Sequence, residues 1–505
     1  MQKNSLQGSI AFVLFATGVT AIGGFLFGYD TAVINGANSY LKEHFTLDDK
    51  QLGMATTSAI LGCIPGAMFA GFLSDRFGRK RMLFLCALLY AVSGVLSAIP
   101  TTFFQFLVAR LISGLGIGAS SMICPVYIAE IAPEKWRGRL GSLFQLGIVT
   151  GIFLTLFVNM LIQGQGNEIW NTTMGWRWML GMEVVPAMIF IGLLFTVPES
   201  PRWLAQKGRE DESRKILQRV GGTEHAEIQL DAIRAVLGQE EGSFSELFAP
   251  TFFRPLAIAV LLMACSQFCG INAIIYYSTE IFETAGAGSV VEENAKVVSS
   301  KANAERLPSR QKESRLAMQN DRNGERLELP DKNASNKKAA FASSVWIGLI
   351  NLLFTLLAIG LVDKMGRKPL LIVGTAVQTI ALILVGSMFY AKSGGIGLLL
   401  CVIAYIAAFA MSLGPIGWLF CSEIFPGKVR GRAMSIASLT VWVSCAIVTQ
   451  TFPMLNGSPW VGPAKTFWIY AAVSLFACLF VCLMIPETKG RTLEEIERYW
   501  IHSAE

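Results

Sequence analysis

The chain has 505 residues, of which 53% are hydrophobic and 15% are charged, and its formal net charge is +6. A soluble globular protein carries about 25% charged residues, so this chain has too few charges to cover a surface that faces water. The excess of cations follows the loops between apolar runs, and no basic patch is interleaved with aromatic residues outside those runs, so we expect no nucleic-acid partner.

Twelve runs are long and apolar enough to span a membrane, which takes about 20 residues. They lie near residues 10–36, 51–74, 81–99, 103–129, 138–162, 176–197, 254–282, 340–362, 369–391, 395–421, 431–455 and 464–485. Many contain Gly and Pro, which is typical of broken or tilted helices that line a path. The first run is too long for a cleavable signal peptide. These runs predict an all-α membrane protein.

The loops after spans 2, 4, 8 and 10 are rich in Lys and Arg, whereas those after spans 3, 9 and 11 hold almost none. Short cytoplasmic loops carry such an excess. We therefore expect a multi-pass protein of a plasma or bacterial inner membrane, with both termini cytoplasmic.

Two polar segments interrupt the apolar runs. Residues 199–253 lie between spans 6 and 7, and their spaced apolar positions predict two or three short amphipathic helices. Residues 286–338 lie in the loop after span 7; they are highly charged and lack aromatic residues, which predicts disorder. This loop is either a lid or docking segment or a tolerated insertion. The predicted division is an N-terminal bundle at 1–198, a linker domain at 199–253, a C-terminal bundle at 254–488 and a tail at 489–505.

Three polar motifs occur twice in the same order. Asp75 to Lys80 returns as Asp363 to Lys368, Glu130 with Arg137 returns as Glu423 with Arg430, and Pro198-Glu199-Ser200 returns as Pro486-Glu487-Thr488; the offsets are 288, 293 and 288 residues. The repeats predict two similar six-helix halves. Two such halves around a central path form an architecture for moving a solute.

The repeated motifs place acids and bases at matching positions. We predict a charge lattice on the inner side, formed by Asp75, Arg79, Glu130, Arg137, Glu199, Asp363, Arg367, Glu423, Arg430 and Glu487. The lattice would hold the two halves together until that side opens. The alternative is a set of solvated pairs worth only about 0–1 kcal/mol each. In each Asp-x-x-Gly-Arg-Lys motif, the glycine is expected to permit a tight turn.

Two ionisable residues lie inside apolar spans, where charge is costly and usually functional. Asp30 lies in span 1 and Arg110 in span 4. A carboxyl group that takes up a proton, beside a cation that can pair with it, is a minimal device for proton coupling. The alternative is a static structural pair.

A second set of intramembrane residues is neutral, and amides offer both donors and acceptors to a hydroxyl-rich solute. The set is Gln145, Gln267, Asn272, Asn351 and Trp418. The indole would suit the apolar face of a sugar ring. The alternative for an isolated amide is a hydrogen bond between helices. All ten cysteines lie in apolar spans without accompanying His, so we expect small packing residues and neither a metal site nor a cofactor. The sequence shows no nucleophile–base arrangement, so we do not expect an enzyme.

The chain resembles the sugar porter family of the major facilitator superfamily. The resemblance rests on the repeated motifs, on Gly28-Tyr29-Asp30, on Gln267 to Asn272 followed by Tyr276-Tyr277, and on Gly414 to Trp418. It implies twelve helices in two bundles that alternate access to a central hexose or pentose site. By position, the family's sugar contacts fall on the five neutral residues above, and Asp30 with Arg110 is similar to the pair of proton-coupled members.

The chain departs from the family pattern at Ser266, Ala410 and Val441, where polar side chains often stand. Each departure removes a hydrogen bond worth about 0.5–1.5 kcal/mol. The resemblance therefore predicts the class of solute but not which sugar is carried. We expect a proton-coupled monosaccharide transporter that is a monomer in the membrane. The alternatives are a uniporter of the same fold and a sugar sensor that moves no solute.

Overall fold

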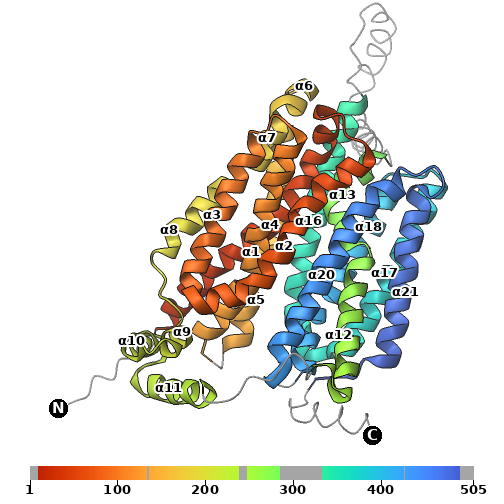
Figure 1. The fold of residues 1–505 in the computed structure, drawn as a ribbon. Coiled ribbons are helices and arrows are strands. Elements are labelled where there is room, and N and C mark those ends of the chain that lie inside the picture. The colour runs from red at the N-terminus through yellow and green to blue at the C-terminus, as the bar shows by residue number, and fades with distance from the viewer. Residues whose placement is uncertain (1–8, 134–135, 238–246, 285–331, 426, 490–505) are drawn as a thin grey trace, which may run out of the picture.

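The computed structural model describes residues 9–133, 136–237, 247–284, 332–425 and 427–489. Within these residues, twelve helical segments are long and apolar enough to cross a membrane. The predicted all-helical membrane fold is confirmed. Figure 1 shows the helices arranged as two bundles that stand side by side, one formed by the N-terminal helices and the other by the C-terminal helices.

The first bundle, called the first half below, contains six spans, and the sixth is built from four short pieces. Its elements are α1 (Ile10–His44), α2 (Asp49–Phe77), α3 (Arg79–Ala98), α4 (Phe103–Ile131), α5 (Arg137–Gln163), α6 (Glu168–Trp170), the π-helical turn Asn171–Gly175, α7 (Trp176–Gly181) and α8 (Val184–Leu194). Asp48 and Gln51 form a capping box that starts α2, so the sequence itself fixes that boundary.

Three short helices follow the first half: α9 (Pro201–Gln206), α10 (Glu210–Gly221) and α11 (Thr223–Leu237). They lie at one end of the first bundle (Figure 1), which we call the linker end; the opposite end is the far end. The indole of Trp203 donates to the carbonyl of Asp75 over 2.9 Å, and the amide of Ser9 donates to the carbonyl of Arg219 over 2.8 Å. The short linker helices predicted from periodicity are therefore present, and α9 and α10 contact the first half.

The second bundle, called the second half, also has six spans. Its elements are α12 (Pro250–Phe268), α13 (Ile271–Thr284), α16 (Lys332–Met365), α17 (Arg367–Tyr390), α18 (Ile396–Met411), α19 (Leu413–Ile424), α20 (Gly427–Asn456) and α21 (Gly462–Met484). Gly270, with φ of 91°, separates α12 from α13, and Ser412 separates α18 from α19. Both breaks fall inside predicted spans.

The start of α16 corrects one prediction. Residues 332–338 were expected in the disordered loop, but they form the first turns of this helix. The reason is that a helix can continue beyond its apolar stretch when its polar side chains find partners: Lys337 pairs with Glu168 of α6 over 2.8 Å. The rest of the predicted loop, up to residue 331, lies outside the described residues.

Within the first half, glycines let the helices approach closely. A side chain at Gly28 of α1 would collide with the backbone of Ile148 in α5, and one at Gly114 of α4 would collide with the backbone of Ala59 in α2. Small residues at such crossings are typical of helices packed in lipid. The close packing of α1 on α5 and of α2 on α4 makes the first half a compact unit.

Each repeated Asp-x-x-Gly-Arg-Lys motif forms the predicted one-residue turn. Gly78 separates α2 from α3 with φ of 99°, and Gly366 separates α16 from α17 with φ of 92°. A side chain at Gly78 would meet the carboxylate of Glu199, and one at Gly366 would meet that of Glu487. The left-handed backbone and the adjacent carboxylate both require glycine at these two positions.

We expect Gly78→Ala to lower the free energy of unfolding by about 1–2 kcal/mol, the cost of placing a side chain in a left-handed conformation, with a further loss because Glu199 is displaced. Thermal unfolding in detergent micelles measures the change. Gly71→Ala is the matched control, because Gly71 lies within α2 and has nothing within 4 Å of the added carbon. Equal midpoints for the two variants would contradict this account of the turn.

Candidate functional site

Asp30 and Arg110 form an ion pair in the middle of the first half. Asp30 of α1 is 0% exposed and Arg110 of α4 is 1% exposed. Nη1 of the guanidinium lies 2.5 Å from Oδ1 of Asp30, and Nη2 lies 3.2 Å from both Oδ2 and the backbone carbonyl of Asp30. The guanidinium thus contacts both carboxylate oxygens, the geometry that gives the strongest charge-assisted hydrogen bonds.

A third ionisable side chain belongs to this group and was missed in the sequence analysis. Glu183 lies between α7 and α8, is 1% exposed, and is close enough to Asp30 and Arg110 to interact electrostatically with both. Among the described atoms, its Oε1 has no hydrogen-bond partner. The rule that drew attention to Asp30 also applies to Glu183, because it too is a carboxyl group inside an apolar span.

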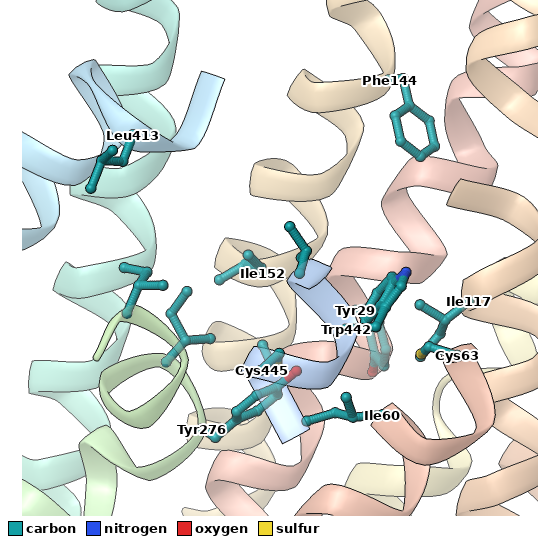
Figure 2. Packing of buried hydrophobic residues seen from close by; sticks show 14 of the residues in the cluster. Tyr29, Ile60, Cys63, Ile117, Phe144, Ile152, Tyr276, Leu413, Trp442 and Cys445 are labelled. Atoms are coloured by element: carbon teal, nitrogen blue, oxygen red, sulfur yellow. The ribbon is translucent and has the colours of Figure 1, made fainter. Parts of the chain in front are cut away.

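We call these three groups the buried charge cluster. Two of them, Asp30 and Arg110, line a small cavity at the meeting of the two halves. The cavity is close to the size of one water molecule. It is lined by Asp30, Thr31, Thr56, Ala59, Ile60, Cys63, Arg110 and Ile117 of the first half and by Tyr276 and Trp442 of the second. Figure 2 shows Ile60, Cys63, Tyr276 and Trp442 in this region. The carboxylate of Asp30 therefore shares this cavity with residues of the opposite half.

The predicted sugar contacts are only partly joined by hydrogen bonds. Asn272 donates to Oε1 of Gln267 over 2.6 Å and to the thiol of Cys445 on α20. Gln145 lies half-buried on α5, Asn351 is buried on α16, and Trp418 on α19 is 38% exposed. Within the described residues, no hydrogen bond joins these last three to the Gln267–Asn272 pair. The role of all five in sugar binding stays a prediction.

At the far end, polar contacts join the two halves. Lys337 of α16 pairs with Glu168 of α6, Ser39 of α1 donates to Glu283 of α13 over 3.1 Å, and Gln450 of α20 donates to the backbone carbonyl of Lys50 in α2 over 3.0 Å. Closer to the centre, the rings of Phe27 and Trp442 lie 5.7 Å apart. The far end of the molecule is thus closed in this structure.

At the linker end, the repeated charged motifs make their contacts within each half. Arg79 contacts both oxygens of Glu130 over 3.1 Å, and Ser200 donates to the same carboxylate. Arg79 also pairs with Asp75 over 2.8 Å. Glu199 accepts hydrogen bonds from the backbone amides of Arg79 and Lys80, so it caps the start of α3.

The second half repeats this arrangement. Arg367 contacts Glu423 over 2.9 Å, Thr488 donates to the same carboxylate over 2.6 Å, and Glu487 accepts from the backbone amides of Arg367 and Lys368 over 3.0 Å. Burial raises the pKa of the Glu487 carboxyl, but backbone hydrogen bonds lower it further, so this pKa lies below its usual value.

The predicted lattice between the halves is not assembled by these contacts, since each ion pair joins residues of one half. Arg137 lies exposed at the start of α5, and the side chains of Asp363 and Arg430 lie outside the described atoms. A latch that forms when the linker end closes stays a prediction.

The chain matches the family model described as "Sugar (and other) transporter" over residues 16–301 and 331–500. It is 38% identical over 495 residues to the arabinose-proton symporter of Bacillus subtilis (98% of this chain, 96% of the relative). It is 35% identical over 526 residues to the D-xylose-proton symporter of Escherichia coli (98% and 97%). The inward-open structure of the E. coli xylose transporter is 34% identical, with a TM-score of 0.78 over 97% of this chain and 100% of that one.

We expect Arg110→Met to lower the free energy of unfolding by about 3 kcal/mol or more, because Asp30 is left buried without its cation. Adding Asp30→Asn to this variant should restore part of the loss, since the uncompensated carboxylate is removed. Thermal unfolding of the two single variants and the double variant measures this coupling. Additive effects of the two substitutions would contradict a direct pairing.

Proposed function

Because the chain belongs to the sugar transporter family, we propose that it carries a monosaccharide, a hexose or a pentose, across a membrane by alternating access and couples this movement to a proton. The family and its sugar-transporting relatives support sugar transport as opposed to enzyme chemistry. The single observation that carries proton coupling is the buried charge cluster beside the interface between the halves.

The proposed role of the buried charge cluster, binding a proton, follows from the number of charges that it contains. Two carboxylates and one guanidinium carry a net charge of −1 when both acids are ionised, so the cluster is neutral only when it holds one proton. An uncompensated charge buried away from water is costly. Asp30 is the proposed proton carrier because it lies at the cavity; Arg110 holds its carboxylate in place, and Glu183 is a second acceptor within reach.

The proposed sugar site lies between the halves. Gln145 on α5 would contribute from the first half, and Gln267, Asn272, Asn351 and Trp418 would contribute from the second. Amides on both sides would contact hydroxyl groups, and the indole would lie against the ring. The hydrogen bond between Gln267 and Asn272 supports this assignment, because it places two amides together inside the membrane region.

We assign the linker end to the cytoplasm, because the cation-rich loops lie there. With this assignment, both termini are cytoplasmic. The molecule then has its outer end closed, in keeping with its likeness to an inward-open transporter structure. Closing the linker end would bring the charged motifs of the two halves together, which is the proposed latch. We propose that the monomer is the transporting unit, since each chain contains both halves of the path.

Uptake of radiolabelled sugars into reconstituted vesicles tests the function, with a panel of hexoses and pentoses and with or without an imposed pH gradient. Accumulation that depends on the gradient is the expected result. Uptake that only equilibrates, without alkalinisation of the medium when sugar is added, would identify a uniporter. Binding without any uptake would identify a sensor and overturn the transport proposal.

We expect Asp30→Asn to abolish uphill sugar uptake while exchange of sugar for sugar continues, because the amide cannot carry the proton but preserves the shape of the side chain. Uptake driven by a pH gradient and counterflow without one are measured on the same vesicles. Asp211→Asn is the control, since Asp211 is an exposed carboxylate on α10. An Asp30→Asn variant that still concentrates sugar would refute coupling through this residue.

We expect Gln267→Ala to raise the half-saturating sugar concentration about five- to tenfold, which is the effect of losing one hydrogen bond to a hydroxyl group. Initial counterflow rates over a range of sugar concentrations measure it. Gln378→Ala is a matched control, because Gln378 is a buried amide on α17 that donates to Ser412 within the second half. Similar shifts in both variants would speak against direct sugar contact by Gln267.

A further inference from the structure

The break between α12 and α13 brings two amide side chains together. Gly270 has a φ of 91°, in the left-handed region that favours glycine. Gln267 lies in the last turn of α12, and Asn272 lies in the first turn of α13. Nδ2 of Asn272 donates to Oε1 of Gln267 over 2.6 Å. Both residues are proposed sugar contacts, so the atoms that this pairing leaves without partners decide what a sugar can meet.

A relay of hydrogen bonds fixes which atoms of the two amides meet. The hydroxyl of Ser266 donates to the backbone carbonyl of Met263 over 2.7 Å, and Nε2 of Gln267 donates to the same hydroxyl over 3.0 Å. A carbonyl oxygen can only accept, so each hydrogen bond in the relay is directed toward Met263. Oε1 of Gln267 is therefore the atom turned toward Asn272, and it accepts from Nδ2.

Cys445, which Figure 2 shows on α20, lies at the other end of this relay. Nδ2 of Asn272 lies 2.9 Å from its sulfur. The residue is 2% exposed, so water does not compete for this contact. The sulfur also lies 3.9 Å from the hydroxyl of Thr449, one turn further along the helix. Cys445 therefore does more than fill space, which is the role expected for it from the sequence.

The two contacts of Asn272 use both N–H groups of its amide, which has two such donors and one oxygen acceptor. Among the described residues, no hydrogen bond reaches Oδ1 of Asn272. This oxygen is thus the atom left for a ligand. Turning the amide over would place Oδ1 against Oε1 of Gln267, with two acceptors facing each other, and would break both contacts.

We propose that Ser266 and Cys445 are positioning residues of the sugar site, which together hold the amide pair so that Asn272 turns its oxygen toward the sugar. This inference rests on the proposed function and deepens it, since neither residue is assigned a sugar contact. It also sets a rule of specificity. The group of the sugar that meets Asn272 has to donate a hydrogen bond, which a hydroxyl group can do and a ring oxygen cannot.

Counterflow in reconstituted vesicles tests the proposal, with D-xylose, L-arabinose, D-glucose and D-galactose as probes. For the sugar with the lowest half-saturating concentration, we expect Cys445→Ala and Ser266→Ala each to raise that concentration about three- to tenfold, because the amides are no longer held for one hydroxyl group. The maximal rate should change little. Cys445→Ser should restore most of the affinity, since its oxygen also accepts. Cys445→Val, which keeps the bulk of the side chain, serves if the alanine variant does not fold.

A double variant separates positioning from general stability. If the thiol acts through Asn272, adding Cys445→Ala to Asn272→Ala should raise the half-saturating concentration no further. Cys86→Ala is the matched control, because Cys86 is a fully buried thiol on α3 of the first half. This control should leave the half-saturating concentration unchanged.

Fluorinated sugars test the orientation of the amide. Fluorine in place of a hydroxyl group cannot donate a hydrogen bond. At one position of the ring, a monofluoro analogue should therefore compete poorly with its parent sugar in the wild-type protein. This penalty should shrink in Cys445→Ala, where the amide can turn an N–H toward the fluorine, and should persist in Cys86→Ala.

Unchanged half-saturating concentrations in the variants of Ser266 and Cys445, or additive effects of Cys445→Ala and Asn272→Ala, would overturn the positioning role. An equal fluorine penalty in the wild-type protein and in Cys445→Ala would do the same. Wild-type vesicles that carry none of the probe sugars would instead refute the proposed function, and this inference with it.

Discussion

The constraint on which the structure depends is that charge buried away from water must be compensated by the protein itself. Asp30, Arg110 and Glu183 come from three different spans and are almost fully buried. Arg110 contacts both oxygens of Asp30, while Oε1 of Glu183 has no partner among the described atoms. A cluster of two acids and one base carries a net charge of −1 when both acids are ionised, and the proton of the proposed function would balance that charge.

The same constraint explains why the halves can act as units. At the linker end, Glu130 and Glu423 bind an arginine of their own half, and Glu199 and Glu487 cap a helix of their own half. These contacts do not need to break when the halves move against each other. Polar contacts that do cross between the halves, such as those of Asn35 and Lys337, lie toward the far end. Rigidity within a half and reversible contact between halves are what alternating access requires.

Much of the fold could be predicted from the chain because its signals are local. The turns at Gly78 and Gly366 follow from a glycine between two apolar runs, and the Asp30–Arg110 pair follows from the cost of lone charges in lipid. Glu183 was missed although the same rule applied to it. The first turns of α16 were missed because their stability comes from Lys337 pairing with Glu168, a contact distant in sequence.

The sequence by itself determined the number of spans, the division into two halves and the residue types available for proton and sugar, because each of these depends on hydrophobicity, spacing or repetition along the chain. Only the tertiary structure decided that the charged motifs close within each half and that α13 is kinked where Asn35 of α1 contacts it. Those features depend on which side chains of different helices meet in space. Such partners are 51 residues apart for Arg79 and Glu130 and 240 apart for Asn35 and Ile275, and contacts of this kind leave no periodic signal in the sequence.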